Sequence, residues 1–287
     1  MLNAAPLILA GNGAAAVVVH LRVMGVLQRI AVADLIASLV VLWLPPAGEV
    51  VVTGGLLVGY WAVLAWVPVP GHHAGLLTPS VNVSGWVDRM VLGSAHMYPA
   101  GRGGYDPEGL LGCLSAAAGV LIGHLVGRVL RARQRQGVTL AALMAAGVTM
   151  LSVGLAWSHV LPVNKRLWTP SYVVLMSGLA TLALALTHLL VDNRARVSAL
   201  VASPLRVLGM NALVVYAGTE LTGAALGAAH HTVPGIPHAP LTYWVWWRWL
   251  APAFGSWRGN LVWAVGVLAL WWVAAAALWQ RRWLIRA

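Results

Sequence analysis

The sequence predicts an all-α protein, built as a polytopic bundle of transmembrane helices. Of its 287 residues, 60% are hydrophobic and only 9% are charged, and the mean hydropathy is +0.80. An ordinary soluble domain carries about 25% charged residues. A chain this apolar lacks the polar residues to cover a soluble surface, which excludes soluble enzymes, nucleic-acid-binding domains and disordered proteins.

The apolar residues are gathered into segments of membrane-spanning length. A helix needs about 20 mostly apolar residues to cross the hydrocarbon core of a bilayer. About seven segments satisfy this length, and we predict spans at 26–44, 50–67, 110–130, 138–157, 171–190, 207–228 and 259–279. We treat 1–287 as a single transmembrane domain with a long extracytoplasmic loop at 68–109.

The positions of the arginines predict the orientation of these spans. Three short connections carry dense arginine clusters, at Arg128, Arg131, Arg133 and Arg135, at Arg194, Arg196 and Arg206, and at Arg281, Arg282 and Arg286. With seven spans these clusters share one side, and the positive-inside rule makes that side cytoplasmic. The N-terminus is then outside and the C-terminus cytoplasmic. The net charge of +11 therefore reflects orientation in a lipid bilayer and not a nucleic-acid partner. We expect a multi-pass protein of the plasma (inner) membrane. The sequence leaves open whether it forms a homo-oligomer.

Ionisable and polar residues within predicted spans are candidates for function, because their burial in a membrane is costly. Arg29 lies near the outer end of the first span, where the alternatives are snorkelling to the interface and a functional role. Glu220 is the acid placed furthest inside the membrane, with Tyr216 one turn before it on the same face. Asn211 points to another face, where hydrogen bonding between helices is the alternative to a substrate contact.

Two polar segments lie outside the spans. Asp106-Pro107-Glu108 precedes the third span, where Asp as N-cap, Pro at the first helical position and an early Glu are typical of a helix start. A carboxylate pair at a membrane mouth also suits a base for a substrate amine. The loop 159–172 holds Lys165, the one lysine of the chain, and Trp168, which an interfacial belt would also explain. A single cysteine and ten histidines without ligand spacing predict no metal site.

Several of these segments together resemble one family, the heparan-alpha-glucosaminide N-acetyltransferase-like membrane proteins. Its motifs G-V-L-Q-R-I, D-P-E-G, W…P-x-N-K-x-L-W-T-x-S-Y and L-G-x-N-A/S-L…Y…E are similar, in the same order, to 25–30, 106–109, Trp157 with 162–172, and 208–213 with Tyr216 and Glu220. The third motif is the most specific. The resemblance covers nearly the whole chain beyond residue 20.

The resemblance implies a membrane acyltransferase. Acetyl-CoA would donate an acetyl group from the cytoplasmic side, and the amine of a glucosamine-type sugar would accept it on the far side. Asp106 and Glu108 are then the catalytic candidates. The candidates for substrate binding are Arg29, Asn164, Lys165, Trp168, Tyr172, Asn211, Tyr216 and Glu220.

The chain departs from the family pattern at its N-terminus. Family members carry earlier spans and a luminal histidine in an H-x-x-W-x-G-type motif before the G-V-L-Q-R segment, and this chain begins after them. The expectation is an N-terminally shortened member, whether through a misplaced start codon, a fragment or a degenerate protein. An amino-sugar transporter or permease component, with the same polar groups forming a site at the bilayer midplane, is the alternative function.

Overall fold

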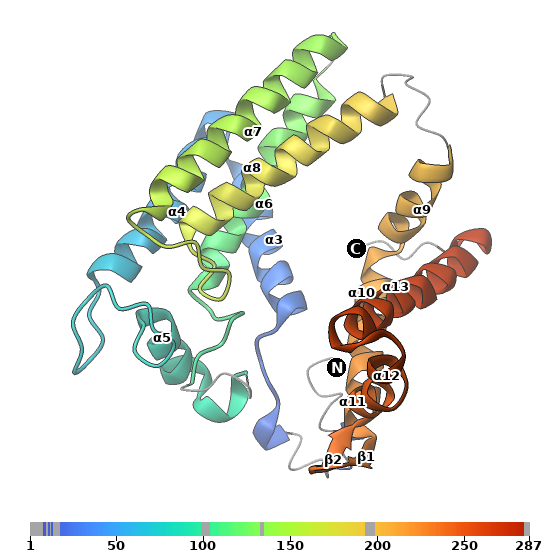
Figure 1. Cartoon of the computed structure of the whole chain (residues 1–287). Coiled ribbons are helices and arrows are strands. Elements are labelled where there is room, and N and C mark those ends of the chain that lie inside the picture. The colour runs from blue at the N-terminus through green and yellow to red at the C-terminus, as the bar shows by residue number, and fades with distance from the viewer. Residues whose placement is uncertain are drawn as a thin grey trace. The chain divides into compact units, whose positions relative to one another are not determined.

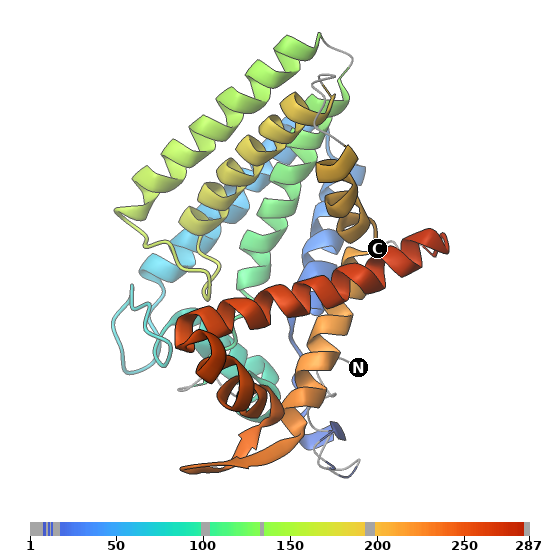
Figure 2. The ribbon, with the colours of Figure 1, turned by 45° about the vertical axis from the view of Figure 1, so that its right-hand side comes forward.

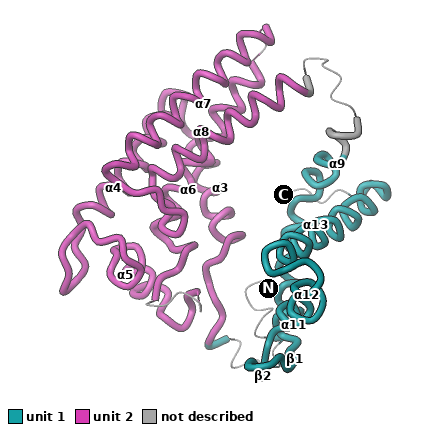
Figure 3. Tube along the Cα trace, viewed as in Figure 1, with its two compact units in different colours: residues 1–19, 196–287 teal, residues 20–195 magenta. Residues whose placement is uncertain are grey.

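The computed structural model of the chain is almost entirely helical (Figure 1). It describes residues 8–9, 11, 13, 18–98, 104–132, 135–192 and 199–283. The chain divides into two compact units, unit 1 with Met1–Val19 and Arg196–Ala287, and unit 2 with His20–Ala195 (Figure 3). Each unit is considered by itself, and the expected single domain over 1–287 stays a prediction.

Unit 2 is a bundle of long apolar helices with a short helix in the loop that joins two of them. Its elements are α3 (Val26–Trp43), α4 (Pro46–Trp66), α5 (Val83–Leu92), the 3-10 turn η2 (Ser94–His96), α6 (Gly112–Arg131), α7 (Gln136–Ser158), α8 (Pro170–Thr187) and the π-helical turn η3 (His188–Asp192). Pro46 and Pro170 stand in the first turns of α4 and α8, where a missing backbone N–H costs no hydrogen bond.

Glycines allow α7 and α8 to pack closely along their length, and Figure 2 shows the two helices side by side. A Cβ atom at Gly154 would lie 2.6 Å from the backbone nitrogen of Leu175. One at Gly178 would lie 2.6 Å from the backbone nitrogen of Leu151. Such small-residue contacts are a common means of helix association in membranes, where lipid removes the hydrophobic driving force.

Helix α6 is the centre of unit 2, because it contacts α3, α4, α7 and α8. Ala117 and Ala118 on α6 are fully buried against these neighbours. At the C-terminal end of α6, Arg128 donates a hydrogen bond of 3.0 Å to the buried carboxylate of Glu49 on α4, and His124 Nε2 lies 3.6 Å from the same carboxylate. This cluster ties the end of α6 to the start of α4.

Unit 1 contains α9 (Ala199–Met210), α10 (Ala212–Ala228), strands β1 (His230–Val233) and β2 (Ile236–Pro240), α11 (Leu241–Val245), the π-helical turn η4 (Trp246–Leu250), α12 (Ala251–Phe254) and α13 (Ser256–Gln280). The two strands form an antiparallel hairpin that pairs His230 with Pro240 and Val233 with Ile236. The side chain of Trp272 on α13 donates to the carbonyl of Pro204 on α9, over 3.2 Å.

The structure confirms a multi-pass helical membrane protein and leaves the count of seven spans unconfirmed. Six of the helices that the structure describes are long and apolar enough to cross a membrane. The expected span at 207–228 is interrupted, because Asn211 leaves the helical conformation (φ −126°, ψ 28°) and separates α9 from α10. Helix α10 has 17 residues. The orientation remains a prediction, and of the arginines behind it, Arg133, Arg194, Arg196 and Arg286 lie outside the described residues.

Candidate functional site

The Asp-Pro-Glu-Gly segment is a tight turn in front of α6. The Oδ1 atom of Asp106 accepts the backbone N–H of Glu108 at 3.0 Å, and the Asp106 carbonyl accepts the N–H of Gly109 at 3.0 Å. The thiol of Cys113 donates to the Gly109 carbonyl at 3.6 Å. Helix α6 begins at Gly112, with Leu111 as its N-cap. The expectation that Asp106 caps this helix was therefore wrong, because its side chain closes the turn before the helix.

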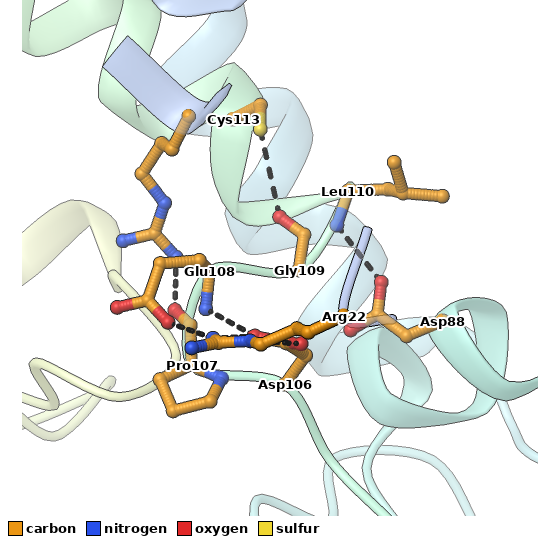
Figure 4. A network of polar contacts seen from close by, with 9 residues as sticks. Arg22, Asp88, Asp106, Pro107, Glu108, Gly109, Leu110 and Cys113 are labelled. Atoms are coloured by element: carbon orange, nitrogen blue, oxygen red, sulfur yellow. Dashed lines mark hydrogen bonds and ion pairs between the residues drawn. The ribbon is translucent and has the colours of Figure 1, made fainter. Parts of the chain in front are cut away.

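Arg22 holds both carboxylates of this turn (Figure 4). Its guanidinium donates to Asp106 at 3.1 Å and 2.5 Å and also donates to Glu108. Burial by itself would lower the pKa of Arg22, but the hydrogen bonds and charges of Asp106 and Glu108 raise it above its ordinary value. Arg22 is therefore charged at any physiological pH, and its positive charge offsets part of the negative charge of Asp106 and Glu108.

The backbone beside Arg22 is fixed by the loop that follows α5. Val23 donates its N–H to the carbonyl of His96 at 3.0 Å, and Nδ1 of His96 lies 2.9 Å from the carbonyl of Leu21. The guanidinium carbon of Arg22 lies 4.8 Å from the centre of the Tyr98 ring. These contacts hold Arg22, which precedes the first span in sequence, beside the Asp-Pro-Glu-Gly turn.

Arg29 approaches the same turn from α3. It is 5% exposed and donates to the carbonyl of Pro107. Its guanidinium carbon lies 4.5 Å from the centre of the Trp168 ring, within the range of a cation–π interaction. Snorkelling to the interface is therefore wrong for Arg29, because its head group is buried between a backbone carbonyl and an aromatic ring.

The loop between α7 and α8 presents Trp168 and Lys165. The side-chain oxygen of Asn164 accepts the N–H groups of Arg166 and Leu167 at 2.9 Å and 3.2 Å. The Trp168 backbone adopts a left-handed conformation with φ +53°, which is strained for a residue with a side chain.

Two contacts hold this strained loop in place. The hydroxyl of Tyr60 donates to the Leu167 carbonyl at 2.7 Å. The rings of Trp168 and Tyr172 meet edge to face, with centroids 5.1 Å apart. The position of Trp168 is thus fixed by contacts with α4 and α8.

A cavity of about 650 Å³ opens between these groups, and its lining combines charged and apolar residues. Its charged lining comes from Arg29, Glu108 and Lys165, and Trp168 and Tyr172 supply aromatic rings. The remaining lining is mostly apolar and is contributed by α3, α6 and α8. Ligand sites in proteins are commonly clefts of about 300–1,000 Å³ with a few convergent polar groups.

The structure brings together five of the predicted site residues, which line the cavity: Arg29, Glu108, Lys165, Trp168 and Tyr172. Asp106 lies outside the lining, with its side chain fully buried against Arg22.

Asn164 supports its own loop and is also outside the lining. Asn211, Tyr216 and Glu220 belong to unit 1. Asn211 is fully buried, while Glu220 is exposed. The roles proposed for all of these residues stay predictions.

The sequence analysis did not single out two residues that this site depends on, Arg22 and Asp88. Asp88 lies on α5, inside the segment expected to be a loop, and is fully buried. Its Oδ1 accepts the N–H of Leu110 at 2.8 Å. Burial raises the pKa of Asp88 to about 6, although the hydrogen bond from Leu110 opposes this shift. The sequence gives no clear signal for its burial, because α5 mixes apolar residues with Ser84, Asp88 and Arg89.

The described residues contain no group of three or more His, Cys, Asp or Glu side chains that could hold a metal ion. The chemistry available at the cavity is that of two cations, one carboxylate and two aromatic rings. These groups can bind a polar molecule, orient it and exchange a proton with it.

Sequence comparison identifies two similar proteins of known function. The chain is 28% identical to human heparan-alpha-glucosaminide N-acetyltransferase over 194 residues, which cover 58% of this chain and 29% of the human protein. It is 28% identical to the mouse protein over 189 residues, which cover 56% of this chain and 28% of the mouse protein. The chain thus spans less than a third of the length of these relatives. No family model matches the chain.

Proposed function

We propose that this chain, a distant relative of the heparan-alpha-glucosaminide N-acetyltransferases, transfers an acetyl group from acetyl-CoA to the amine of a glucosamine-type sugar. The cavity of unit 2 is the reaction site. The observation that carries the proposal is the meeting of Glu108, Lys165 and Trp168 in one cavity, from two of the segments that resemble this family. The protein would act in the plasma (inner) membrane, with this end of the bundle outside.

The lining supplies the chemistry that an amine acceptor needs. A sugar ammonium must lose a proton before its nitrogen attacks a thioester, and Glu108 is the carboxylate in the cavity lining that would accept it. The nitrogen then forms a bond to the acetyl carbon, the bond from that carbon to sulfur breaks, and the sulfur of CoA takes up a proton. Arg29 and Lys165 would stabilise the negative charge that develops on the acetyl oxygen.

The aromatic residues suit a sugar acceptor. Trp168 and Tyr172 both line the cavity, and their rings meet edge to face. Aromatic rings pair an apolar face with a polar group, which fits the mixed surface of a pyranose.

A second cavity adjoins the first along α6 and α8, which supports access for acetyl-CoA from the end of the bundle opposite Glu108. This second cavity, of about 200 Å³, shares Gly119, Ser177 and Ala180 with the first and extends along α6 and α8 to Val126 and Leu184. These two helices end near the expected cytoplasmic side, where arginines such as Arg128 and Arg131 would attract the phosphates of CoA.

The proposal is tested with membranes that contain this chain, labelled acetyl-CoA and glucosamine. We expect labelled N-acetylglucosamine above the level of membranes that lack the chain. If this chain, and a form of it extended upstream of Met1, both leave the product at the background level, the acetyltransferase proposal fails. Uptake of labelled glucosamine into sealed vesicles without acetylation would instead support the transporter alternative.

A further inference from the structure

A buried acid on α5 supports the Asp-Pro-Glu-Gly turn from outside the cavity. Asp88 is fully buried and does not line the cavity. Figure 4 shows Asp88 and Glu108 on different sides of the turn backbone, with Asp88 directed at Leu110. The other carboxylate oxygen of Asp88, Oδ2, has no hydrogen-bond partner among the described residues. Burial of a carboxylate with so few hydrogen bonds costs free energy, so the position of Asp88 needs an explanation.

The contact between Asp88 and the turn leaves no room for a side chain. A Cβ atom at Gly109 would overlap the Asp88 carboxylate. The glycine of the Asp-Pro-Glu-Gly motif therefore allows the turn backbone to press directly against Asp88. Gly109 follows Glu108 in sequence, so the position of this contact sets where the Glu108 side chain enters the cavity.

We propose that Asp88 is a positioning residue, whose carboxyl group fixes the 106–110 turn and thereby holds Glu108 at the cavity. This role rests on the proposed function only in so far as Glu108 acts on a substrate. The hydrogen bond from Leu110 does not offset the cost of burying the Asp88 charge, a cost that opening of the turn to water would relieve. Protonation of Asp88 removes this cost and therefore tightens the turn.

The groups that surround Asp88 are mixed in charge. Asp106 on the turn disfavours its charge, while Arg29 on α3 and Arg89 on α5 favour it. The hydroxyl of Tyr60 on α4 and the thiol of Cys113 on α6 also face it. With a pKa of about 6, Asp88 changes its charge over a pH range in which carboxylates with ordinary pKa values remain ionised.

Hydrogen exchange of the peptide that spans 106–110 tests this role without any ligand. In the wild-type chain, corrected for the intrinsic exchange rate, we expect protection to rise about tenfold between pH 7.5 and 5, because protonation removes the cost of the buried charge. Asp88→Asn keeps a neutral acceptor for Leu110, so its protection should not change with pH. Asp88→Ala removes the acceptor, and its protection should be low at both pH values. Wild-type protection that does not rise at pH 5, or full protection in Asp88→Ala, overturns the proposal.

Binding of N-acetylglucosamine, the proposed product, links the turn to the cavity. This sugar has no group that titrates between pH 5 and 7.5, so any pH dependence belongs to the protein. We expect the wild-type affinity to rise by up to about tenfold at pH 5, and Asp88→Asn to show no such rise. Asp34→Asn, a change of an exposed acid on α3, should behave as the wild type does.

The two proposals fail in different ways. A wild-type chain that binds no sugar at either pH contradicts the proposed function, while hydrogen exchange still decides the role of Asp88. Sugar binding with the wild-type pH dependence in Asp88→Asn contradicts the positioning role alone.

Discussion

Arg22 and Arg29 converge on one short turn, yet their surroundings assign them different tasks. Arg22 forms ion pairs with Asp106 and Glu108 and lies outside the cavity lining. Arg29 donates to a backbone carbonyl, lies over the ring of Trp168 and lines the cavity. Arg22 therefore holds the turn together, whereas Arg29 is placed to meet a ligand.

Replacement of Arg29 by lysine should impair the site while the charge is kept. An ammonium group lacks the planar fork that allows Arg29 to bind Pro107 and stack on Trp168 at once. We expect kcat/KM for acetyl transfer to fall at least about tenfold, since about 1.4 kcal/mol corresponds to that factor. Arg258→Lys is the matched control, because Arg258 is exposed on α13 and does not line the cavity. An equal effect of the two changes would contradict a specific role for Arg29.

Asp88 makes the stability of the chain depend on pH in a definite direction. Its pKa of about 6 in the folded chain lies above the ordinary value of 3.8, so the folded state binds the proton more tightly than the unfolded state. This group contributes most stability below about pH 4, and the contribution is lost as the pH rises to about 6, by about 3 kcal/mol at most.

Asp88→Asn should abolish this dependence. The variant carries no charge to bury, so we expect it to unfold at a higher temperature than the wild type at pH 7.5, with the difference disappearing at pH 4. Thermal unfolding of the purified protein in detergent at both pH values measures this. A variant less stable than the wild type at pH 7.5 would show that the charge of Asp88 stabilises the fold.

At the scale of the elements, hydropathy predicted most of unit 2 and missed the structure of its loops. The helices α3, α4, α6, α7 and α8 agree with the expected spans to within four residues at each end. Apolar runs of this length leave few alternatives in a bilayer, because each backbone polar group must be paired within the helix.

The missed elements have local causes. Helix α5 is short and mixed in polarity, so neither its length nor its hydropathy distinguished it from a loop. The break at Asn211 was missed because the residues on both sides of it are apolar, and their hydropathy does not reveal a change of backbone conformation. Contacts such as that between Arg22 and Asp106, 84 residues apart, depend on tertiary structure and leave no local pattern.

The close packing of α7 on α8 gives a prediction at this scale. Gly154→Ala places a methyl group against the Leu175 backbone, which cannot yield as a flexible side chain would, so we expect a loss of about 1–3 kcal/mol in the free energy of unfolding. Gly137→Ala on the same helix meets open space and should be neutral or stabilise by up to about 1 kcal/mol. Denaturation of both variants in the same detergent checks the prediction, and equal stabilities would contradict the close contact.

At the scale of the whole molecule, the bundle has two ends of different character. One end of unit 2 carries the cavity with Glu108 and Lys165, and the opposite end of α6 carries Arg128 and Arg131. The positive-inside rule predicts that the arginine end faces the cytoplasm. The proposed reaction needs this orientation, with the acceptor reaching the cavity from outside.

Cysteine labelling in intact cells tests the orientation. In a Cys113→Ser background, Lys165→Cys should react with a membrane-impermeant thiol reagent, since residue 165 is exposed in its loop. Arg131→Cys, exposed at the other end of the bundle, should react only after the cells are permeabilised. The reverse pattern would invert the orientation and remove the support for an external acceptor.

The central claim is that Glu108 takes part in acetyl transfer at the cavity, and one comparison of rates tests it most directly. The measurement is the formation of N-acetylglucosamine from acetyl-CoA and glucosamine by Glu108→Gln, Asp34→Asn and the wild-type chain, at equal amounts of inserted protein. The account predicts that Glu108→Gln lowers kcat/KM at least about 100-fold, the usual contribution of a general base, and that Asp34→Asn leaves it unchanged. Equal rates for all three proteins would contradict it.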